Sequence, residues 1–411
     1  MTDRFQPRSS DAPLIVYFDI KSPYAFVAKD PTYQLADRLG IEIDWRPLTL
    51  DIPSYLGSAQ LNKRGEVVKS NRTKQQWGGV RYAYMDARRY ASAWGYTLRG
   101  TEKIWDTSLV HIAFSWVKRH APSAVRNFLD LAYPRFWSRD LDVENLAVVC
   151  SLIESCGVST TGFAKWSDSE GRVQHDMEQA AIFADAIYGV PGYVHRDEYY
   201  FGREHLPFIE SLLGGSYDDT PDVAYSLPAV ALIQEGSGTK HEVFLMMRRA
   251  AAAGKLSIVA GVNKDCLQSH LALATLEHVL KEFPGALTIE FGELAAANPS
   301  SALSSNPIGL PIENPTVTSE TDRSVAHKKF RAGYERSNVE RYVRSRKVDN
   351  AALNRKRVEE ITFSDQAKLQ LETNGVTRSF GFLFIDELQN AHPFNGRQHL
   401  FLLRWALEKA K

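Results

Sequence analysis

The chain has 411 residues, more than the ~250–300 at which one hydrophobic core usually stops growing, so we expect two domains. Apolar residues make up 44% of it and charged residues 24%, as in ordinary globular proteins. The formal net charge is zero, which argues against nucleic acid or an anionic membrane as the main partner. Three cysteines cannot build a disulfide framework and lack metal-ligand spacing, so we expect no metal and a reducing, cytoplasmic setting.

The start of the chain and its apolar segments bear on location. Residues 1–12 are polar and lack the apolar core of a secretory signal, so we expect a flexible N-terminus. No segment approaches the roughly 18 uninterrupted apolar residues of a membrane-spanning helix, so we expect no span.

A strand that runs directly into a helix opens the fold. Leu14–Asp19 is apolar and β-rich until its last residue, as in a strand buried on both faces. Ser22 is a favoured N-cap and Pro23 suits the first helical position, which predicts a helix that continues to Leu39. A second strand at 41–45 makes a strand–helix–strand unit with a parallel pair. Backbone N–H groups and a hydroxyl therefore meet at the sheet's carboxyl edge, where a thiolate is stabilised.

The rest of the first half predicts a helical block and a small hairpin. A loop is expected over 46–63, and helical spacing from about 65 to 186 predicts a bundle inserted over one side of the sheet. A hairpin at 193–201 and a helix at 203–213 complete the domain. Residues 216–225 are acidic and contain a proline, which predicts a linker.

The second half repeats the alternation of strands and helices. Residues 294–328 are rich in Ala, Asn, Pro, Ser and Thr, which predicts a long loop. Strands are predicted at 229–233, 256–261, 287–291 and 380–385, and helices at 241–253, 265–283, 329–360 and 397–409.

Two segments match between the halves. The pattern G-R-[EQ]-H-L occurs at Gly202–Leu206 and at Gly396–Leu400, and IVYFDIKSPYAF aligns with IVAGVNKDCLQS. We therefore predict one fold used twice, with residues 226–411 as a degenerate copy of residues 13–215. Chance similarity of short strand–helix segments is the alternative.

Four segments of the first half carry a family resemblance: Tyr17–Tyr24, Arg81–Arg89, Gly189–Pro191 and Phe201–Leu206. In this order and at these separations they resemble the DsbA-like thioredoxin-fold family, in the branch of 2-hydroxychromene-2-carboxylate isomerases and kappa-class glutathione transferases. The resemblance covers about half of the chain and implies a thioredoxin-like α/β fold for residues 13–215. Together with the match between the halves, it predicts an α/β fold of two tandem thioredoxin-like domains, the first with a large helical insertion at about residues 65–186 and the second degenerate.

The resemblance also implies a glutathione site in the first domain. Ser22 would hydrogen-bond the glutathione sulfur, Pro191 would follow a cis peptide bond, and Val190 would offer its backbone to the cysteinyl part. Arg203 and Glu204 would lie at the start of the last helix, where the acidic side chain would hold the γ-glutamyl end.

Three positions depart from the family's pattern. Glu204 and His205 stand where an aspartate followed by an arginine is usual, and Gly192 stands where a bulkier residue is usual.

Further side chains are candidates for substrate contacts. Tyr24 follows the Ser-Pro start of the first helix, and Asp86 and Arg89 could frame a substrate carboxylate. Ion pairs on a helix surface are the alternative for the last two, and Ser22 itself could be only an N-cap.

Cys266 raises the question of a redox site in the second half. It begins a C-x-x-S pattern at a predicted helix start, one residue past the aligned counterpart of Ser22. Such a thiol would have a depressed pKa and could form a mixed disulfide. Thr377-Arg378 stands where the proline should be, and a half-buried bystander cysteine is the alternative.

These features favour a glutathione-dependent isomerase or transferase that acts on a small aromatic electrophile. The alternatives are a non-catalytic interaction or scaffold protein with a thioredoxin-like fold and a monothiol oxidoreductase that uses Cys266. The expected partner is a small-molecule substrate, and association into a homodimer stays open.

Overall fold

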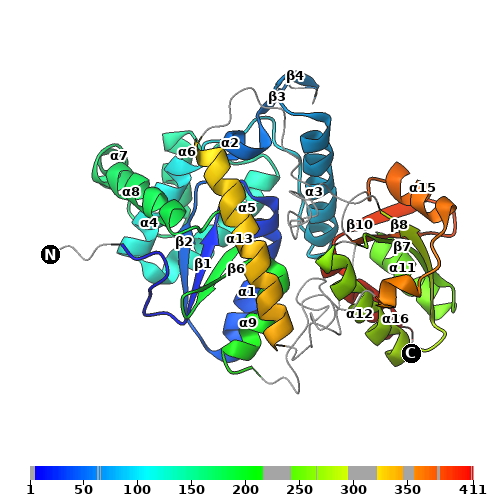
Figure 1. Cartoon of the computed structure of the whole chain (residues 1–411). Coiled ribbons are helices and arrows are strands. Elements are labelled where there is room, and N and C mark those ends of the chain that lie inside the picture. Colours follow the sequence, from blue (N-terminus) through cyan, green and yellow to red (C-terminus); the bar gives the residue numbers. More distant parts are fainter. Residues whose placement is uncertain are drawn as a thin grey trace. The chain divides into compact units, whose positions relative to one another are not determined.

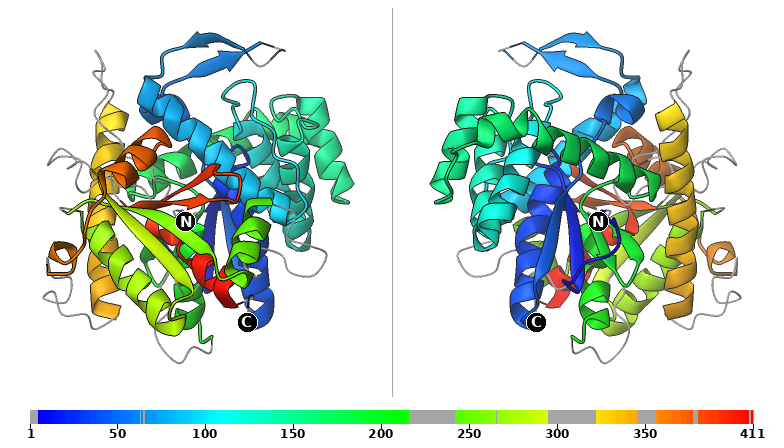
Figure 2. Two further views of the ribbon diagram at one scale, coloured as in Figure 1. Left: turned by 90° about the vertical axis from the view of Figure 1, so that its right-hand side faces the viewer. Right: turned by 90° about the vertical axis from the view of Figure 1, so that its left-hand side faces the viewer.

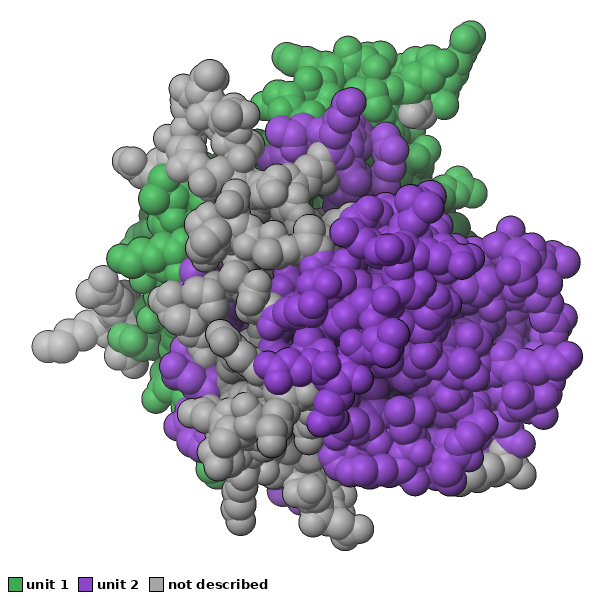
Figure 3. Space-filling view, turned by 45° about the vertical axis from the view of Figure 1, so that its right-hand side comes forward, with its two compact units in different colours: residues 1–72, 95–205, 321–330 green, residues 73–94, 206–320, 331–411 purple. Residues whose placement is uncertain are grey.

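The computed structural model describes residues 5–62, 64, 66–215, 242–264, 266–294, 322–345, 356–376, 380–408 and 410. Its contacts divide the chain into two compact units, which are coloured in Figure 3. Unit 1 comprises residues 1–72, 95–205 and 321–330, and unit 2 comprises residues 73–94, 206–320 and 331–411. Each unit therefore takes segments from both halves of the sequence.

The sheet of unit 1 has the strand order β2-β1-β5-β6. It consists of β1 (Leu14–Phe18), β2 (Ile43–Pro47), β5 (Gly192–His195) and β6 (Glu198–Phe201). β1 pairs with β2 in parallel and with β5 antiparallel, and α1 (Pro23–Leu39) connects the parallel pair. Every side chain of β1 is buried, because both faces of a central strand are covered. The predicted strand–helix–strand opening is confirmed.

Helices of the insertion pack around α4 in unit 1 (Figures 1 and 2). They are α4 (Ser108–His120), η1 (Pro122–Ala124), α5 (Val125–Trp137), α6 (Leu146–Ser155), α7 (Phe163–Ser167) and α8 (Glu170–Ala184). The predicted loop before them contains α2 (Ile52–Leu56) and β3 (Ala59–Leu61), which forms a hairpin with β4 (Val67–Ser70). The strand β4 was predicted as helix, and short hairpins of this kind lack a long periodic pattern.

One helix of the insertion belongs to unit 2. Helix α3 (Lys74–Ala93) starts with a capping box between Thr73 and Gln76, and its contacts group it with the second sheet. The predicted single bundle over the first sheet is therefore wrong at this helix, because an amphipathic pattern shows that one face is buried but not which element covers it.

The sheet of unit 2 has the strand order β10-β9-β7-β8. It consists of β7 (Leu256–Val262), β8 (Leu287–Glu293), β9 (Gly381–Ile385) and β10 (Ala391–Asn395). β7 pairs with β8 in parallel and with β9 antiparallel, and β9 and β10 form a hairpin. The strand order and the strand directions are those of the first sheet.

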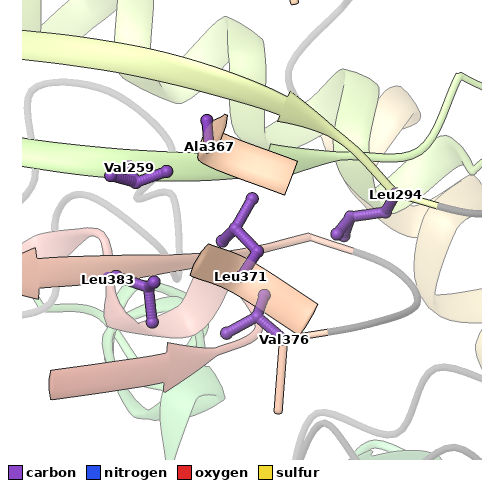
Figure 4. Close-up of a cluster of buried hydrophobic side chains, with 6 residues drawn as sticks. All are labelled: Val259, Leu294, Ala367, Leu371, Val376 and Leu383. Carbon is purple, nitrogen blue, oxygen red and sulfur yellow. The ribbon is translucent and has the colours of Figure 1, made fainter. Parts of the chain in front are cut away.

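Helices α11 and α15 pack against this sheet. A cluster of buried side chains joins α15 to β7 and β9, as Figure 4 shows: Val259, Leu294, Ala367, Leu371, Val376 and Leu383. Helices α11 and α16 pack against each other. The helices are α9 (Leu206–Leu212), α11 (Glu242–Ala252), α12 (Leu267–Glu282), α14 (Lys356–Glu359), α15 (Asp365–Thr373) and α16 (Phe401–Glu408), with η3 (Arg397–His399).

Helix α13 (Asp322–Ser345) begins inside the segment predicted as a long loop, and its first residues, up to Phe330, belong to unit 1. The predicted linker at 216–225 and the predicted strand at 229–233 lie outside the described residues. Within the described part of the chain, no helix is both long and apolar enough to span a membrane.

Candidate functional site

The corner between β1 and α1 has the geometry that the sequence predicts. Ser22 is the N-cap of α1, and its Oγ accepts a hydrogen bond of 3.2 Å from the backbone N–H of Ala25. The backbone N–H of Ser22 donates to the carbonyl of Asp19 at 3.0 Å. Pro23 occupies the first helical turn, and Tyr24 is half-buried in the same turn. Ser22 itself is only 5% exposed, so its hydroxyl lies at a largely dry helix N-terminus.

The bend before β5 lies beside this corner. The peptide bond between Val190 and Pro191 is cis, as the resemblance implies. The next residue, Gly192, pairs with Tyr17 near the end of β1, so the bend adjoins the carboxyl end of that strand. The carbonyl of Pro191 accepts a 2.9 Å hydrogen bond from the backbone N–H of Gly202, which ties the bend to the end of β6.

The packing around residue 192 explains why a glycine stands there. A Cβ at this position would lie 2.8 Å from the ring of Tyr199 and 2.9 Å from the carbonyl oxygen of Gly189. The hydroxyl of Tyr199 donates to that same carbonyl at 2.8 Å, so the ring cannot move away without losing a buried hydrogen bond. The bulkier residue that is usual in the family has no room here.

Arg203 and Glu204 lie in a short 3-10 helix, η2 (Arg203–His205), directly before α9, and both side chains are buried. The Glu204 carboxylate folds back over Gly202, whose φ of +105° favours glycine. A side chain at Gly202 would collide with that carboxylate. The predicted acidic group therefore stands at a helix start, as expected, although the start is a 3-10 turn.

A buried polar network lies close to Ser22 in the sequence and the fold, and the sequence analysis did not predict it. The Asp19 carboxylate is fully buried and accepts hydrogen bonds of 2.8 Å from the Thr107 hydroxyl and 2.8 Å from the backbone N–H of Leu50. His111 Nε2 lies 3.3 Å from Asp19 Oδ1. The one sequence signal was Asp19 itself, a charge at the end of an otherwise apolar strand.

The network continues through Thr49 to a second histidine. The Thr49 hydroxyl lies 2.7 Å from His111 Nδ1 and 3.2 Å from His175 Nε2. Both imidazoles are buried. The network joins the residue after β1 and the segment before α2 to side chains of α4 and α8, which are far apart in the sequence.

Burial and neighbouring charges shift the pKa values of Asp19 and His175. Burial alone would raise the pKa of Asp19, but the neighbouring charges of Lys21 and His111 outweigh it and hold the pKa well below its usual range. Burial, assisted by repulsion from His111, lowers the pKa of His175 from 6.5 to about 3. Asp19 is therefore ionised and His175 neutral near pH 7.

The substrate candidates Asp86 and Arg89 lie in unit 2, whereas Ser22 lies in unit 1. Their side chains are buried and 3.6 Å apart. The Arg89 guanidinium donates to the carbonyl of Pro393 at 2.9 Å and lies 4.1 Å from the centroid of the Phe394 ring. These contacts attach α3 to β10.

His399 completes the attachment of α3 to the second sheet. Its Nδ1 lies 2.9 Å from the hydroxyl of Tyr90, and its Nε2 lies 3.3 Å from the hydroxyl of Tyr82. The Tyr82 hydroxyl also accepts a hydrogen bond of 2.8 Å from the backbone N–H of Asn395. The histidine of the second G-R-[EQ]-H-L segment therefore serves a contact within unit 2.

Cys266 holds the place of Ser22 in the second sheet's corner. Each is the N-cap of its helix, and each lies the same distance beyond the strand residue that pairs with a glycine, Tyr17 with Gly192 and Gly261 with Gly381. The alignment that put Cys266 one residue later is corrected by this register.

The expected low pKa of Cys266 is wrong. The side chain is 4% exposed, and burial raises its pKa, although the N–H groups of Ser269 and Gln268 act in the opposite direction. At Cys266 the desolvation of the buried thiol outweighs the stabilisation that the helix N-terminus gives a thiolate. Unit 2 therefore has the N-cap geometry of the corner, but the pKa of its thiol is raised.

The counterpart of Pro191 in unit 2 is Phe380. Its carbonyl accepts a 2.9 Å hydrogen bond from the backbone N–H of Gly396, as that of Pro191 does from Gly202. Thr377 and Arg378 lie outside the described residues. A phenylalanine in unit 2 thus stands where a proline stands in unit 1.

Among the described residues no group of three His, Cys, Asp or Glu side chains is placed to hold a metal ion.

Comparison with known proteins bears on the first half of the chain. Residues 13–214 match the family model of the DSBA-like thioredoxin domain. The first half of this chain is a DSBA-like thioredoxin domain. It is an α/β domain with a helical insertion, and the predicted family resemblance is confirmed.

Two curated relatives align with this DSBA-like domain. The 2-hydroxychromene-2-carboxylate isomerase of Pseudomonas putida is 23% identical over 202 residues, 48% of this chain and 92% of the relative. The enzyme of the same name from Sphingobium xenophagum is 22% identical over 202 residues, 48% of this chain and 95% of the relative. Both distant relatives are isomerases, and both alignments span about half of this chain.

Two solved structures also align with about half of this chain. A 2-hydroxychromene-2-carboxylate isomerase has a TM-score of 0.39 at 20% identity and covers 49% of this chain and 94% of its own. A probable DsbA oxidoreductase from Streptomyces coelicolor has a TM-score of 0.37 at 18% identity and covers 49% and 87%.

Proposed function

We propose that the DSBA-like domain binds glutathione and catalyses a glutathione-dependent isomerisation or transfer on a small aromatic electrophile. One observation carries the proposal. Ser22 caps α1 beside the cis bend at Val190-Pro191, in a domain whose curated relatives are 2-hydroxychromene-2-carboxylate isomerases. The proposed setting is cytoplasmic, where glutathione is abundant and reduced.

The corner suits a thiolate. The Ser22 oxygen accepts the Ala25 N–H, so its own O–H hydrogen can be donated to a sulfur. The N-terminus of the 17-residue helix α1 favours a negative charge at the same place. Both effects lower the pKa of a bound thiol.

The chemistry needs no external oxidant or reductant. The thiolate sulfur forms a bond to an electrophilic carbon of the substrate, the adduct rearranges, and the same sulfur–carbon bond breaks when the isomer leaves. In a transfer reaction, the sulfur–carbon bond is kept and a leaving group departs. The remaining contacts to glutathione would come from the backbone of Val190 and from Arg203 and Glu204.

We also propose that the second sheet is a degenerate copy of the same thioredoxin-like domain. The support is the shared strand order, the matching N-caps Ser22 and Cys266, and the matching hydrogen bonds of Gly202 and Gly396. The raised pKa of Cys266 argues against thiol chemistry in that copy.

A non-catalytic interaction protein is the second candidate. Its support is that Ser22 already caps α1, which accounts for a serine at this position without any ligand. Titration of the full chain with glutathione in a calorimeter separates the two, because only the enzyme is expected to bind.

The variant Ser22→Gly tests the role of the hydroxyl. Glycine is a tolerable N-cap that costs only a few tenths of a kcal/mol, so the fold should keep its stability. Loss of the hydroxyl should lower turnover of 2-hydroxychromene-2-carboxylate about ten-fold or more, if it stabilises the thiolate by ~1.4 kcal/mol.

Ser22→Thr is the matched control, since it keeps the hydroxyl and should keep most of the activity. Turnover of Ser22→Gly equal to that of the unaltered chain would remove Ser22 from the mechanism. Absence of glutathione binding by the unaltered chain would reject the proposed function.

A further inference from the structure

Three rings from distant parts of the sequence meet in unit 1. His327, in the first turns of α13, stacks on Tyr55 of α2 with ring centroids 4.4 Å apart and planes 5° apart. The ring of Tyr188 meets His327 edge-on, with centroids 5.3 Å apart. All three residues belong to unit 1, although α13 comes from the second half of the chain.

Other contacts hold the start of α13 in this position. Arg323 forms an ion pair of 3.3 Å with Asp51, the residue before α2, and its guanidinium lies 4.1 Å from the centroid of the Phe183 ring. Phe330 packs edge-on against the same ring at 5.2 Å. These contacts are made by residues before and after His327 in the sequence, and they fix its position. The His327 side chain is buried.

His327 contacts two residues that belong to segments leading to the candidate site. Tyr55 lies one turn after the segment whose Leu50 N–H donates a hydrogen bond to Asp19. Burial raises the pKa of Tyr55, and the negative charges of Asp19 and Asp51 raise it further. Tyr188 lies shortly before the cis bend at Val190-Pro191. The imidazole therefore bridges the segment beside the Ser22 corner and the segment that leads into the bend.

The matched domain alone cannot supply this ring. The family match ends at residue 214, and the alignment with the Pseudomonas putida isomerase takes up 92% of that enzyme's length. Helix α13 lies more than a hundred residues beyond the match. The contact to Tyr55 and Tyr188 is therefore an addition made by the second half of this chain.

We propose that His327 contacts the aromatic substrate and, with Tyr55, determines which electrophiles the first unit accepts. The inference rests on the proposed function and deepens it. Parallel rings extend a stack readily, so a planar substrate placed at the end of the pair gains contact with a flat face. An aliphatic electrophile gains less, which predicts a preference for aromatic groups.

Calorimetry on the full chain tests the proposal with two probes, glutathione and S-(2,4-dinitrophenyl)glutathione. The unaltered chain should bind the aryl conjugate more tightly than glutathione. In His327→Leu, which removes the flat ring but keeps a side chain of similar size, the affinity for the conjugate should fall about three- to ten-fold, the range of an aromatic contact. The affinity for glutathione should not change.

Two further variants sharpen the test. His327→Phe keeps a flat ring and should retain most of the affinity for the conjugate, including where His327→Leu fails to fold. Val325→Ala, which alters an exposed side chain of the same helix, should leave both affinities unchanged.

The outcomes separate this inference from the proposed function. Equal loss of affinity for both probes in His327→Leu, or no loss for either, would overturn the role of His327 while glutathione binding stands. Lower conjugate affinity in His327→Phe than in His327→Leu would also overturn it. An unaltered chain that binds neither probe would reject the proposed function, and the role of His327 with it.

Discussion

At the scale of single residues, we expect buried polar side chains to make the stability of unit 1 depend on pH. Asp19 is fully buried and ionised because Lys21 and His111 compensate for lost hydration. His175 is buried and neutral, because burial and the proximity of His111 disfavour its charged form. Acidification works against both arrangements.

His175 carries the first prediction at this scale. Its pKa is about 3 in the folded chain against 6.5 for the ordinary value, so the unfolded chain takes up the proton first as pH falls. The contribution to stability is complete above about pH 6.5 and should fall by up to ~1.4 kcal/mol per pH unit down to about pH 3. Below about pH 4, protonation of Asp19 should add to the loss.

Urea unfolding followed by circular dichroism between pH 4.5 and 8 measures this slope. His175→Gln should flatten it, whereas His120→Gln, at an exposed position, should leave it as it is. A slope that is identical in all three chains would exclude His175 as its source.

The two corner helices differ at the scale of the element. Ser22 caps α1 with a side-chain hydrogen bond, whereas Cys266 caps α12 without one. The N–H groups of Gln268 and Ser269 nevertheless point at the Cys266 sulfur. A hydroxyl in this position would accept an N–H better than a thiol does.

Cys266→Ser should therefore raise the stability of unit 2 by about 0.5–1 kcal/mol, as a gained N-cap does. Activity of the first unit should not change, since Cys266 takes no part in the proposed chemistry. Urea midpoints measure the gain, with Cys150→Ser, away from any N-cap, as control. A loss of turnover in Cys266→Ser would revive a role for the thiol.

Helix α3 belongs to unit 2, whereas the sequence predicted it in a bundle over the first sheet. Arg89 reaches the backbone of Pro393 and the ring of Phe394, and it balances the buried charge of Asp86. Removing one partner of a buried ion pair leaves a charge without its compensation.

Arg89→Ala should destabilise unit 2 by about 3 kcal/mol or more. KM values for glutathione and substrate should stay unchanged at temperatures where the variant is folded. Arg88→Ala, at an exposed position of the same helix, is the control for thermal unfolding. A raised KM with normal stability would instead make Arg89 the substrate ligand that the sequence suggested.

At the scale of the whole molecule, the family match and the compact units divide the chain differently. The match covers residues 13–214, but residues 73–94 group with unit 2 and residues 321–330 group with unit 1. A chain that ends at Gly215 would keep α3 without β10 and His399, and would lack His327.

We therefore predict that residues 1–215 alone unfold at a lower temperature than the full chain. The buried side of α3, with Asp86, Arg89 and Tyr90, would lose its partners at residues 393–399. Differential scanning calorimetry of the fragment and of the full chain measures the difference. An equally stable fragment would show that the first half folds independently of the second.

Several features were determined by the sequence itself, because their causes are local. The apolar run of β1, the N-cap Ser22 followed by Pro23, and the hairpin before Gly202 depend on neighbouring residues, and the structure has them as predicted. The domain's family followed from segments of this kind in their order along the chain.

Only the tertiary structure decided which distant segments meet. Three examples are the attachment of α3 to the second sheet, the stack of His327 on Tyr55 and the network from Asp19 to His175. They join residues that are between 156 (175 − 19) and 317 (399 − 82) positions apart in the sequence. Periodicity shows that a helix buries one face, but the partner of that face depends on complementary shape and charge elsewhere in the chain.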